Sequence, residues 1–201
     1  LVDGHEAKER KLFRRHLDLH LGVIAPETFG FVELNLHLIG NYKEVRHAVH
    51  SRAVAAGGNY DALDVVSNSA SNGVGTAWQW SNLVESGNAA ELFDAFISFS
   101  EDGIVATSRL HLFRANPSNS ELDDNAALSI AAADQANYIG FIAFEAAVDY
   151  GAISAARAVH AEMPVGIECN DNILYGILQF IDAETNETAG MTVAIHLSVR
   201  G

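Results

Sequence analysis

The sequence predicts an all-β body of β-sandwich or jelly-roll type that follows an amphipathic helical arm. About ten short apolar or alternating segments recur between turn residues, the pattern of an antiparallel all-β domain. The body lacks the long helical segments that a parallel sheet with crossover connections requires. Sixteen glycines against three prolines suit short strands joined by tight turns.

Residues 5–21 have the pattern of an amphipathic helix. Phe13, Leu17 and Leu21 recur at i, i+4 and i+8, and charged residues fill the opposite face. Such a helix either packs on its own domain or docks into the groove of a neighbouring protein, and the pattern leaves both interpretations open. Because residues 22–30 contain helix breakers, we divide the chain into an arm with its linker, residues 1–30, and a body, residues 31–201.

The body is read as a series of strands. Residues 32–38 alternate most clearly between apolar and polar side chains, which indicates a half-buried strand. Residues 45–54 fit both helical and strand periods, and we prefer the strand. The further predicted strands are residues 63–67, 76–83, 92–100, 104–114, 139–144, 152–160, 165–167, 173–180 and 191–200.

Residues 105–144 contain two strand patterns joined by a polar segment. Leu110 and Leu112 fall on one face of the first strand, whereas His111 and Phe113 fall on the other, mostly polar face. Pro117 follows an asparagine and starts a turn, so the first strand must end before it.

The polar segment is rich in acidic residues, for which we expect structural roles. Asp123, Asp124 and Asn125 are expected to hydrogen-bond their own backbone N–H groups. A calcium loop would need more oxygen ligands at set spacing and a glycine at the bend. Asp134 is expected to cap a helical turn over residues 134–138, and the apolar run 139–144 is expected to be a buried strand.

Composition and charge restrict the classes of partner. With 49% hydrophobic and 19% charged residues the chain is globular, and its net charge is −14. Residues 1–20 hold five basic and four acidic residues, which leaves seven basic against 22 acidic residues in the body. Such an acidic body repels phosphate backbones, so we expect no nucleic-acid partner. No apolar run reaches the roughly 18 residues of a membrane span, and no signal peptide is visible, so we expect no membrane partner.

The sequence offers no convincing site for catalysis, for a metal or for a cofactor, and we expect a protein that is not an enzyme. His16 and His20 lie at i, i+4 of the predicted helix, but Asp18 points away from both and cannot complete a metal site. His47 and His50 do not share a strand face. Cys169 lies among apolar residues and is interpreted as a core residue.

Two tryptophans fall on one face of a single predicted strand. Trp78 and Trp80 are separated by one residue. If exposed, the pair could stack on sugar rings or anchor an interface, and if buried, it would fill a sandwich core. We prefer the core interpretation.

The chain resembles a widespread set of small virion structural proteins of tailed bacteriophages. The likeness extends over roughly residues 45–200 as many weak matches, and residues 1–40 do not share it. It is carried, in order, by Tyr60, Asp64-Val65-Val66, Leu110-His111-Leu112-Phe113, Asn116-Pro117, Asp124-Asn125-Ala126, Asp134 and Tyr138-Ile139-Gly140. The resemblance implies a jelly-roll-like β-sandwich and a role as head decoration (cement) or another component of the virion surface.

From this resemblance we expect a capsid decoration protein on the outer surface of the head. Its expected partners are the major capsid protein and copies of itself in a homo-oligomer such as a trimer. Phe13, Leu17 and Leu21 are the expected contact residues of the arm. The alternatives are a tail or baseplate component, or a carbohydrate-binding β-sandwich that recognises host glycans through Trp78 and Trp80.

Overall fold

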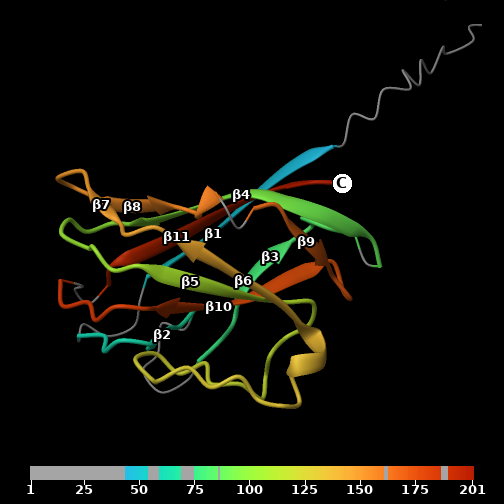
Figure 1. Cartoon of the computed structure of the whole chain (residues 1–201), viewed down its shortest axis with the longest axis horizontal. Coiled ribbons are helices and arrows are strands. Elements are labelled where there is room, and N and C mark those ends of the chain that lie inside the picture. The colour runs from blue at the N-terminus through green and yellow to red at the C-terminus, as the bar shows by residue number, and fades with distance from the viewer. Residues whose placement is uncertain (1–43, 54–58, 69–74, 86, 161–162, 187–189) are drawn as a thin grey trace, which may run out of the picture. The chain divides into compact units, whose positions relative to one another are not determined.

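The structure consists of two antiparallel β-sheets with almost no helix, which confirms the all-β prediction (Figure 1). This computed structural model describes residues 44–53, 59–68, 75–85, 87–160, 163–186 and 190–201. The predicted arm and linker, residues 1–30, and the predicted strand 32–38 lie outside the described residues.

The first sheet contains six strands in the order β1-β11-β4-β8-β7, and β9 also pairs with β4. Each pair of neighbours is antiparallel, and β1 pairs with β11 over its full length from Val45 to Ala53. The strands are β1 (Val45–Ala53), β4 (Ala89–Phe99), β7 (Val148–Asp149), β8 (Ser154–Arg157), β9 (Val165–Glu168) and β11 (Thr192–Arg200).

The second sheet contains five strands in the order β2-β10-β5-β6, and β3 pairs with the other half of β10. Its strands are β2 (Val65–Val66), β3 (Trp78–Ser81), β5 (Ser108–Phe113), β6 (Tyr138–Phe144) and β10 (Ile173–Phe180). A single turn of 3-10 helix, η1 (Gln135–Asn137), precedes β6.

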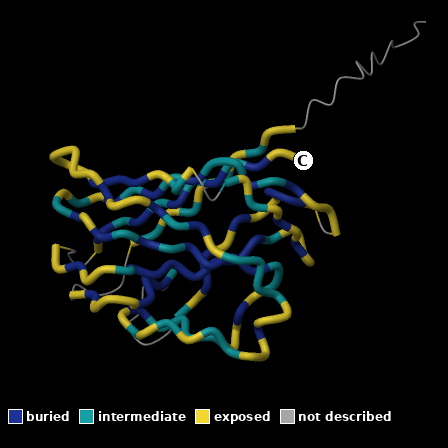
Figure 2. The backbone as a smooth tube through the Cα atoms, in the orientation of Figure 1, coloured by how far each residue is buried: buried dark blue, intermediate teal, exposed yellow. Residues whose placement is uncertain are grey.

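The main core lies between the two sheets, where buried residues follow the strands (Figure 2). In β11 every second residue from Val193 to Val199 is buried, in keeping with the two unlike faces of a strand whose side chains alternate. Trp78 and Trp80 are each 1% exposed and belong to this core. The indole N–H groups donate to the backbone oxygens of Val66 and Ile195 at 2.9 and 3.3 Å. Core filling is therefore the role of both tryptophans in this fold.

A second, smaller core covers the outer face of the second sheet. Phe113, Tyr175 and Ile177 are buried there and pack with partly buried residues of the connection between β5 and η1, namely Leu122, Leu128 and Ile130. His111 on the same face is also buried. The prediction of a mostly polar face at this strand was wrong. The long connection after β5 has the hydrophobic pattern of neither a strand nor a helix, yet it folds over this face and buries it.

Asp124 ties together segments that are distant in sequence. Its Oδ1 accepts hydrogen bonds from the Tyr60 hydroxyl and from the backbone N–H of Ser67, both at 2.9 Å. Oδ1 of Asp123 accepts from the backbone N–H of Gly75 at 2.8 Å. The prediction that these carboxylates bind their own backbone was wrong, because the buried connection brings them against backbone donors of other loops.

Asp134 stands at the N-cap position of η1, but its side chain makes no capping hydrogen bond. Its carboxylate instead accepts from the backbone N–H and the side-chain amide of Asn119 and from the Ser120 hydroxyl, at 2.7–3.0 Å. Burial alone would raise the pKa of Asp134, but these hydrogen bonds prevail and lower it. The predicted capping role was wrong, and Asp134 holds the start of the connection against its end.

Glu184 performs a similar task at the other end of β5, just before the strand begins. Its carboxylate, 2% exposed, accepts backbone N–H bonds at Oε2 from Val105 and Ala106 and at Oε1 from Thr185 and Asn186. Residues 104–107 were predicted to be the start of a strand, yet β5 begins only at Ser108. The carboxylate supplies the acceptors that a strand partner would otherwise provide.

Two further predicted strands differ in extent or burial. The segment 152–160 forms a strand only over Ser154–Arg157, because it turns back on β7 through a hairpin that the sequence analysis did not predict. The segment 139–144 was expected to be buried, but β6 is an edge strand and leaves Phe141 38% exposed. An apolar run does not reveal whether both faces of a strand are covered.

Gly176 in β10 provides the first test of this packing. A Cβ at this position would lie 2.8 Å from Cδ1 of Leu110, 3.0 Å from Cζ3 of Trp80 and 3.3 Å from the backbone oxygen of His111. We expect Gly176→Ala to lower the free energy of unfolding by about 1–3 kcal/mol, because the core must shift to admit the methyl group. Urea denaturation measures this change. Gly166→Ala is the matched control, since a Cβ there meets no atom within 4 Å, and equal stability of both variants would contradict the packing.

Asp124 provides the second test. Burial, opposed by its hydrogen bonds and by the charge of Arg52, raises the pKa of Asp124. Asp124→Asn can keep both bonds at Oδ1 and removes the buried charge, so its free energy of unfolding should lie within about 1 kcal/mol of that of the original chain. Asp124→Ala removes both bonds and should cost about 1–3 kcal/mol. Urea denaturation at pH 7 measures both changes, and the assignment would be refuted if Asp124→Asn were less stable than Asp124→Ala.

Candidate functional site

The described part of the chain has a surface depression of about 260 Å³. The start of β1, the connection between β3 and β4 and the end of β11 surround it. Its floor is apolar and its rim is charged and polar. The buried apolar floor residues are Leu83, Val84, Ala90 and Val199, the charged and polar rim residues are Glu44, Arg46, Glu85 and Asn88, and Ala89 and Gly201 complete the lining.

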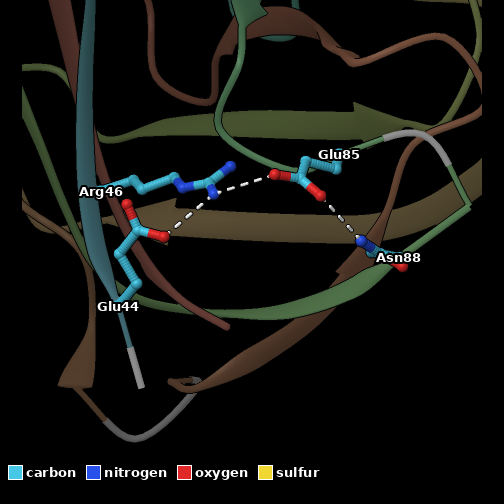
Figure 3. Close-up of polar contacts among 4 residues, drawn as sticks. All are labelled: Glu44, Arg46, Glu85 and Asn88. Atoms are coloured by element: carbon cyan, nitrogen blue, oxygen red, sulfur yellow. Dashed lines mark hydrogen bonds and ion pairs between the residues drawn. The ribbon is translucent and has the colours of Figure 1, made fainter. Parts of the chain in front are cut away.

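The rim is held by one guanidinium between two carboxylates (Figure 3). Nη2 of Arg46 lies 3.0 Å from Oε2 of Glu44 and 3.2 Å from Oε1 of Glu85. The side-chain amide of Asn88 donates to Oε2 of Glu85 at 3.2 Å. Glu85 therefore links the strand β1 to the turn that leads into β4.

The electrostatics of the rim favour ionised side chains. The hydrogen bond from Arg46, and then its charge, lowers the pKa of Glu44, and the same contact raises the pKa of Arg46. The carboxylates are well exposed, so solvent screens the pairs and they contribute little to stability. With two carboxylates and one guanidinium, the rim can receive a basic side chain of a partner, and its size suits one side chain rather than a larger ligand.

The sequence alone does not predict this rim. Arg46 and Glu85 are 39 residues apart, and neither belongs to a motif. The only available signal was the alternation of residues 45–54, which puts Arg46 on the opposite face from Val45 but does not show what it meets.

Several residues considered in the sequence analysis have no part in a site. Trp78 and Trp80 are buried, so neither can stack on a sugar in this fold. His47 and His50 occupy opposite faces of β1, as predicted. Cys169 is fully buried and burial raises the pKa of its thiol to about 11, which favours the unreactive protonated form and confirms the core interpretation.

The predicted contact residues of the arm, Phe13, Leu17 and Leu21, lie outside the described residues, as do His16 and His20. Within the described ranges, no group of three or more His, Cys, Asp or Glu side chains is arranged to hold a metal ion. No helix in those same ranges is long and apolar enough to cross a membrane.

His111 is a buried titratable group whose partners suit the neutral imidazole. The amide nitrogen of Gln179 donates to the backbone oxygen of Leu63, so its Oε1 faces Nε2 of His111 as an acceptor, at 3.2 Å. The Tyr138 hydroxyl lies 3.1 Å from Nδ1 and can donate to it. Burial, aided by the charge of Arg109 and opposed by the Gln179 bond, lowers the pKa of His111.

The lowered pKa predicts a loss of stability in mild acid. The unfolded chain, with an ordinary histidine pKa near 6.5, takes up a proton that folded His111 resists, so its contribution is present above about pH 6.5 and is lost as the pH falls below it. The loss is at most about 1.4 kcal/mol per pH unit for this one group. Urea denaturation from pH 7.5 to 5 should show a shallower pH dependence for His111→Gln than for the original chain. Parallel curves would contradict the assignment.

Comparisons with known proteins place no constraint on these observations. No model of a protein family matches the chain, and no curated protein matches it. The function must therefore be inferred from the residues of this chain and from their arrangement.

Proposed function

We propose that this chain is a non-catalytic structural protein of a tailed-phage virion, and specifically a decoration protein on the outer surface of the head. One observation carries the proposal: the residues behind the sequence resemblance include those that organise the fold. The Tyr60 hydroxyl donates a hydrogen bond to Asp124. Asp134 accepts hydrogen bonds from Asn119 and Ser120. The Tyr138 hydroxyl is hydrogen-bonded to His111. Because these residues hold loops and strands of this chain together, the resemblance to the phage proteins involves residues that support the fold and not only scattered surface positions.

The order of the strands supports the finer assignment of a jelly-roll-like sandwich. The pairs β1 with β11, β3 with β10, β4 with β8 and β5 with β6 are all antiparallel. Strands early in the chain thus pair with strands late in the chain, and the later the first strand of a pair, the earlier its partner. This is the pairing of a long antiparallel hairpin that folds over into two sheets. Jelly rolls of this kind build many viral capsid domains and also lectins. Because a fold alone does not determine function, this support is secondary to the resemblance.

In this proposal the protein stabilises the shell by binding only its assembled form. A protein that binds one state shifts the equilibrium toward it by mass action. Many copies with weak contacts to the major capsid protein and to one another gain further from multivalency. The net charge of −14 keeps the unbound protein soluble at high copy number.

The amphipathic pattern of residues 5–21 is proposed to supply one of these contacts. Phe13, Leu17 and Leu21 would insert into an apolar groove between capsid subunits, a known mode of helix recognition. The charged rim around Arg46 would add a polar contact at the start of β1, with a basic side chain of the shell in the depression.

Binding to heads assembled without this protein tests the proposal. We expect the original chain to co-sediment with such heads in a saturable manner. Phe13→Asp combined with Leu17→Asp should weaken binding by about tenfold or more, because it places two charges in an apolar contact.

Lys11→Asp is the matched control, because it introduces the same side chain on the opposite helical face. Its binding should stay within about twofold of the original. Failure of the original chain to bind would refute the decoration role. Unchanged binding of the Phe13 and Leu17 double variant would refute the arm contact alone.

A further inference from the structure

Four large apolar side chains are exposed around the hairpin formed by β7 and β8. We name Val105, Val148, Tyr150 and Ile153 the hairpin patch; their exposed fractions are 57%, 53%, 67% and 45%. The backbone N–H of Tyr150 donates to the oxygen of Ile153 at 2.8 Å, so these two side chains flank the turn. The N–H of Ala147 donates to the oxygen of Ala106, which brings Val105 and Val148 to the same edge.

The segments that carry the hairpin patch are acidic, and the neighbouring Arg157, whose backbone oxygen accepts from the N–H of Glu145, is itself paired with Asp94. Residues 101–108 and 145–156 contain no lysine, arginine or histidine, whereas they contain Glu101, Asp102, Glu145 and Asp149. Two hairpin patches facing each other would bring carboxylates against carboxylates, which opposes a contact between like patches. The patch therefore requires an apolar surface that carries positive charge.

The same chain offers such a surface on β5 and β6. Phe141 is 38% exposed, and Cζ of Arg109 lies 4.8 Å from the centre of its ring. Arg46, Arg114, Arg157 and Arg200 each form an ion pair with a carboxylate. Within the described residues Arg109 has no such ion pair, so its charge is available to a neighbour. We name this pair the Arg109–Phe141 patch.

We propose that the hairpin patch of one copy docks on the Arg109–Phe141 patch of a second copy. Tyr150 and Ile153 would cover the exposed edge of Phe141, and Arg109 would face the carboxylates around the hairpin, with the nearest candidate Asp149. Aromatic residues and arginine are the side chains that most often dominate such contacts. A contact between unlike patches either closes reciprocally in a dimer or repeats head to tail around a ring.

This inference holds independently of the decoration role, and the mass of the full chain in solution tests it. Sedimentation equilibrium in 0.15 M NaCl should give a multiple of 21.6 kDa, and dissociation should increase in 0.5 M NaCl as charges are screened. Tyr150→Ser with Ile153→Ser, and separately Phe141→Ser, should each raise the dissociation constant by about tenfold or more.

The specificity of the contact appears when the changes are combined. The triple variant joins Tyr150→Ser and Ile153→Ser with Phe141→Ser. If the two patches meet, its dissociation constant should exceed that of the double variant or of Phe141→Ser only slightly, because each change removes the same contact. Val49→Ser is the control, since Val49 is 55% exposed on β1 at the opposite edge of the first sheet; its dissociation constant should not change. Unfolding curves verify that every variant folds.

Three outcomes would overturn the proposal: a monomer at all concentrations, unchanged dissociation in both patch variants, or fully additive effects in the triple variant. The Phe13 and Leu17 double variant separates the two proposals. It should form the same oligomer as the original chain while losing affinity for heads, so the failure of either contact leaves the other testable.

Discussion

Buried carboxylates that accept hydrogen bonds from distant backbone N–H groups are the interaction on which the rest of this structure depends. The connection between β5 and β6 has only one turn of 3-10 helix, yet it covers an apolar sheet face. Backbone groups in such a buried, irregular segment have no ladder of partners and would be costly to leave unpaired. Asp124 and Asp134 provide acceptors there, and Glu184 does so beside β5.

This arrangement allows the second sheet to be covered on both faces without a helix. On its inner face Leu110 and Leu112 join the main core, and on its outer face Phe113 joins the smaller one. β5 and β10 are central strands with partners on both sides, so most of their polar backbone groups are satisfied as well. The result is a sheet covered on both faces whose edge strand β6 remains on the surface.

The surface features are consistent with a protein that acts through contacts. The depression at Arg46, the hairpin patch and the Arg109–Phe141 patch belong to different strand edges, and each combines apolar atoms with charge. Side chains with strongly perturbed environments, such as His111 and Cys169, are instead buried and engaged in packing. The pKa shifts of His111 and Cys169 thus follow from packing, whereas those of Glu44 and Arg46 follow from an ion pair at the surface.

The sequence by itself determined the all-β class, most strand positions and the burial of Cys169, because alternation and turn residues act over a few neighbouring positions. Only the tertiary structure decided what Asp124, Asp134 and Glu184 bind, because their partners, apart from Thr185 and Asn186 beside Glu184, are 14 to 79 residues away. The same holds for the Arg46 rim and for the exposure of Phe141, which depend on strand order and on which edges stay uncovered. Local patterns specify elements, whereas long-range contacts select partners and surfaces.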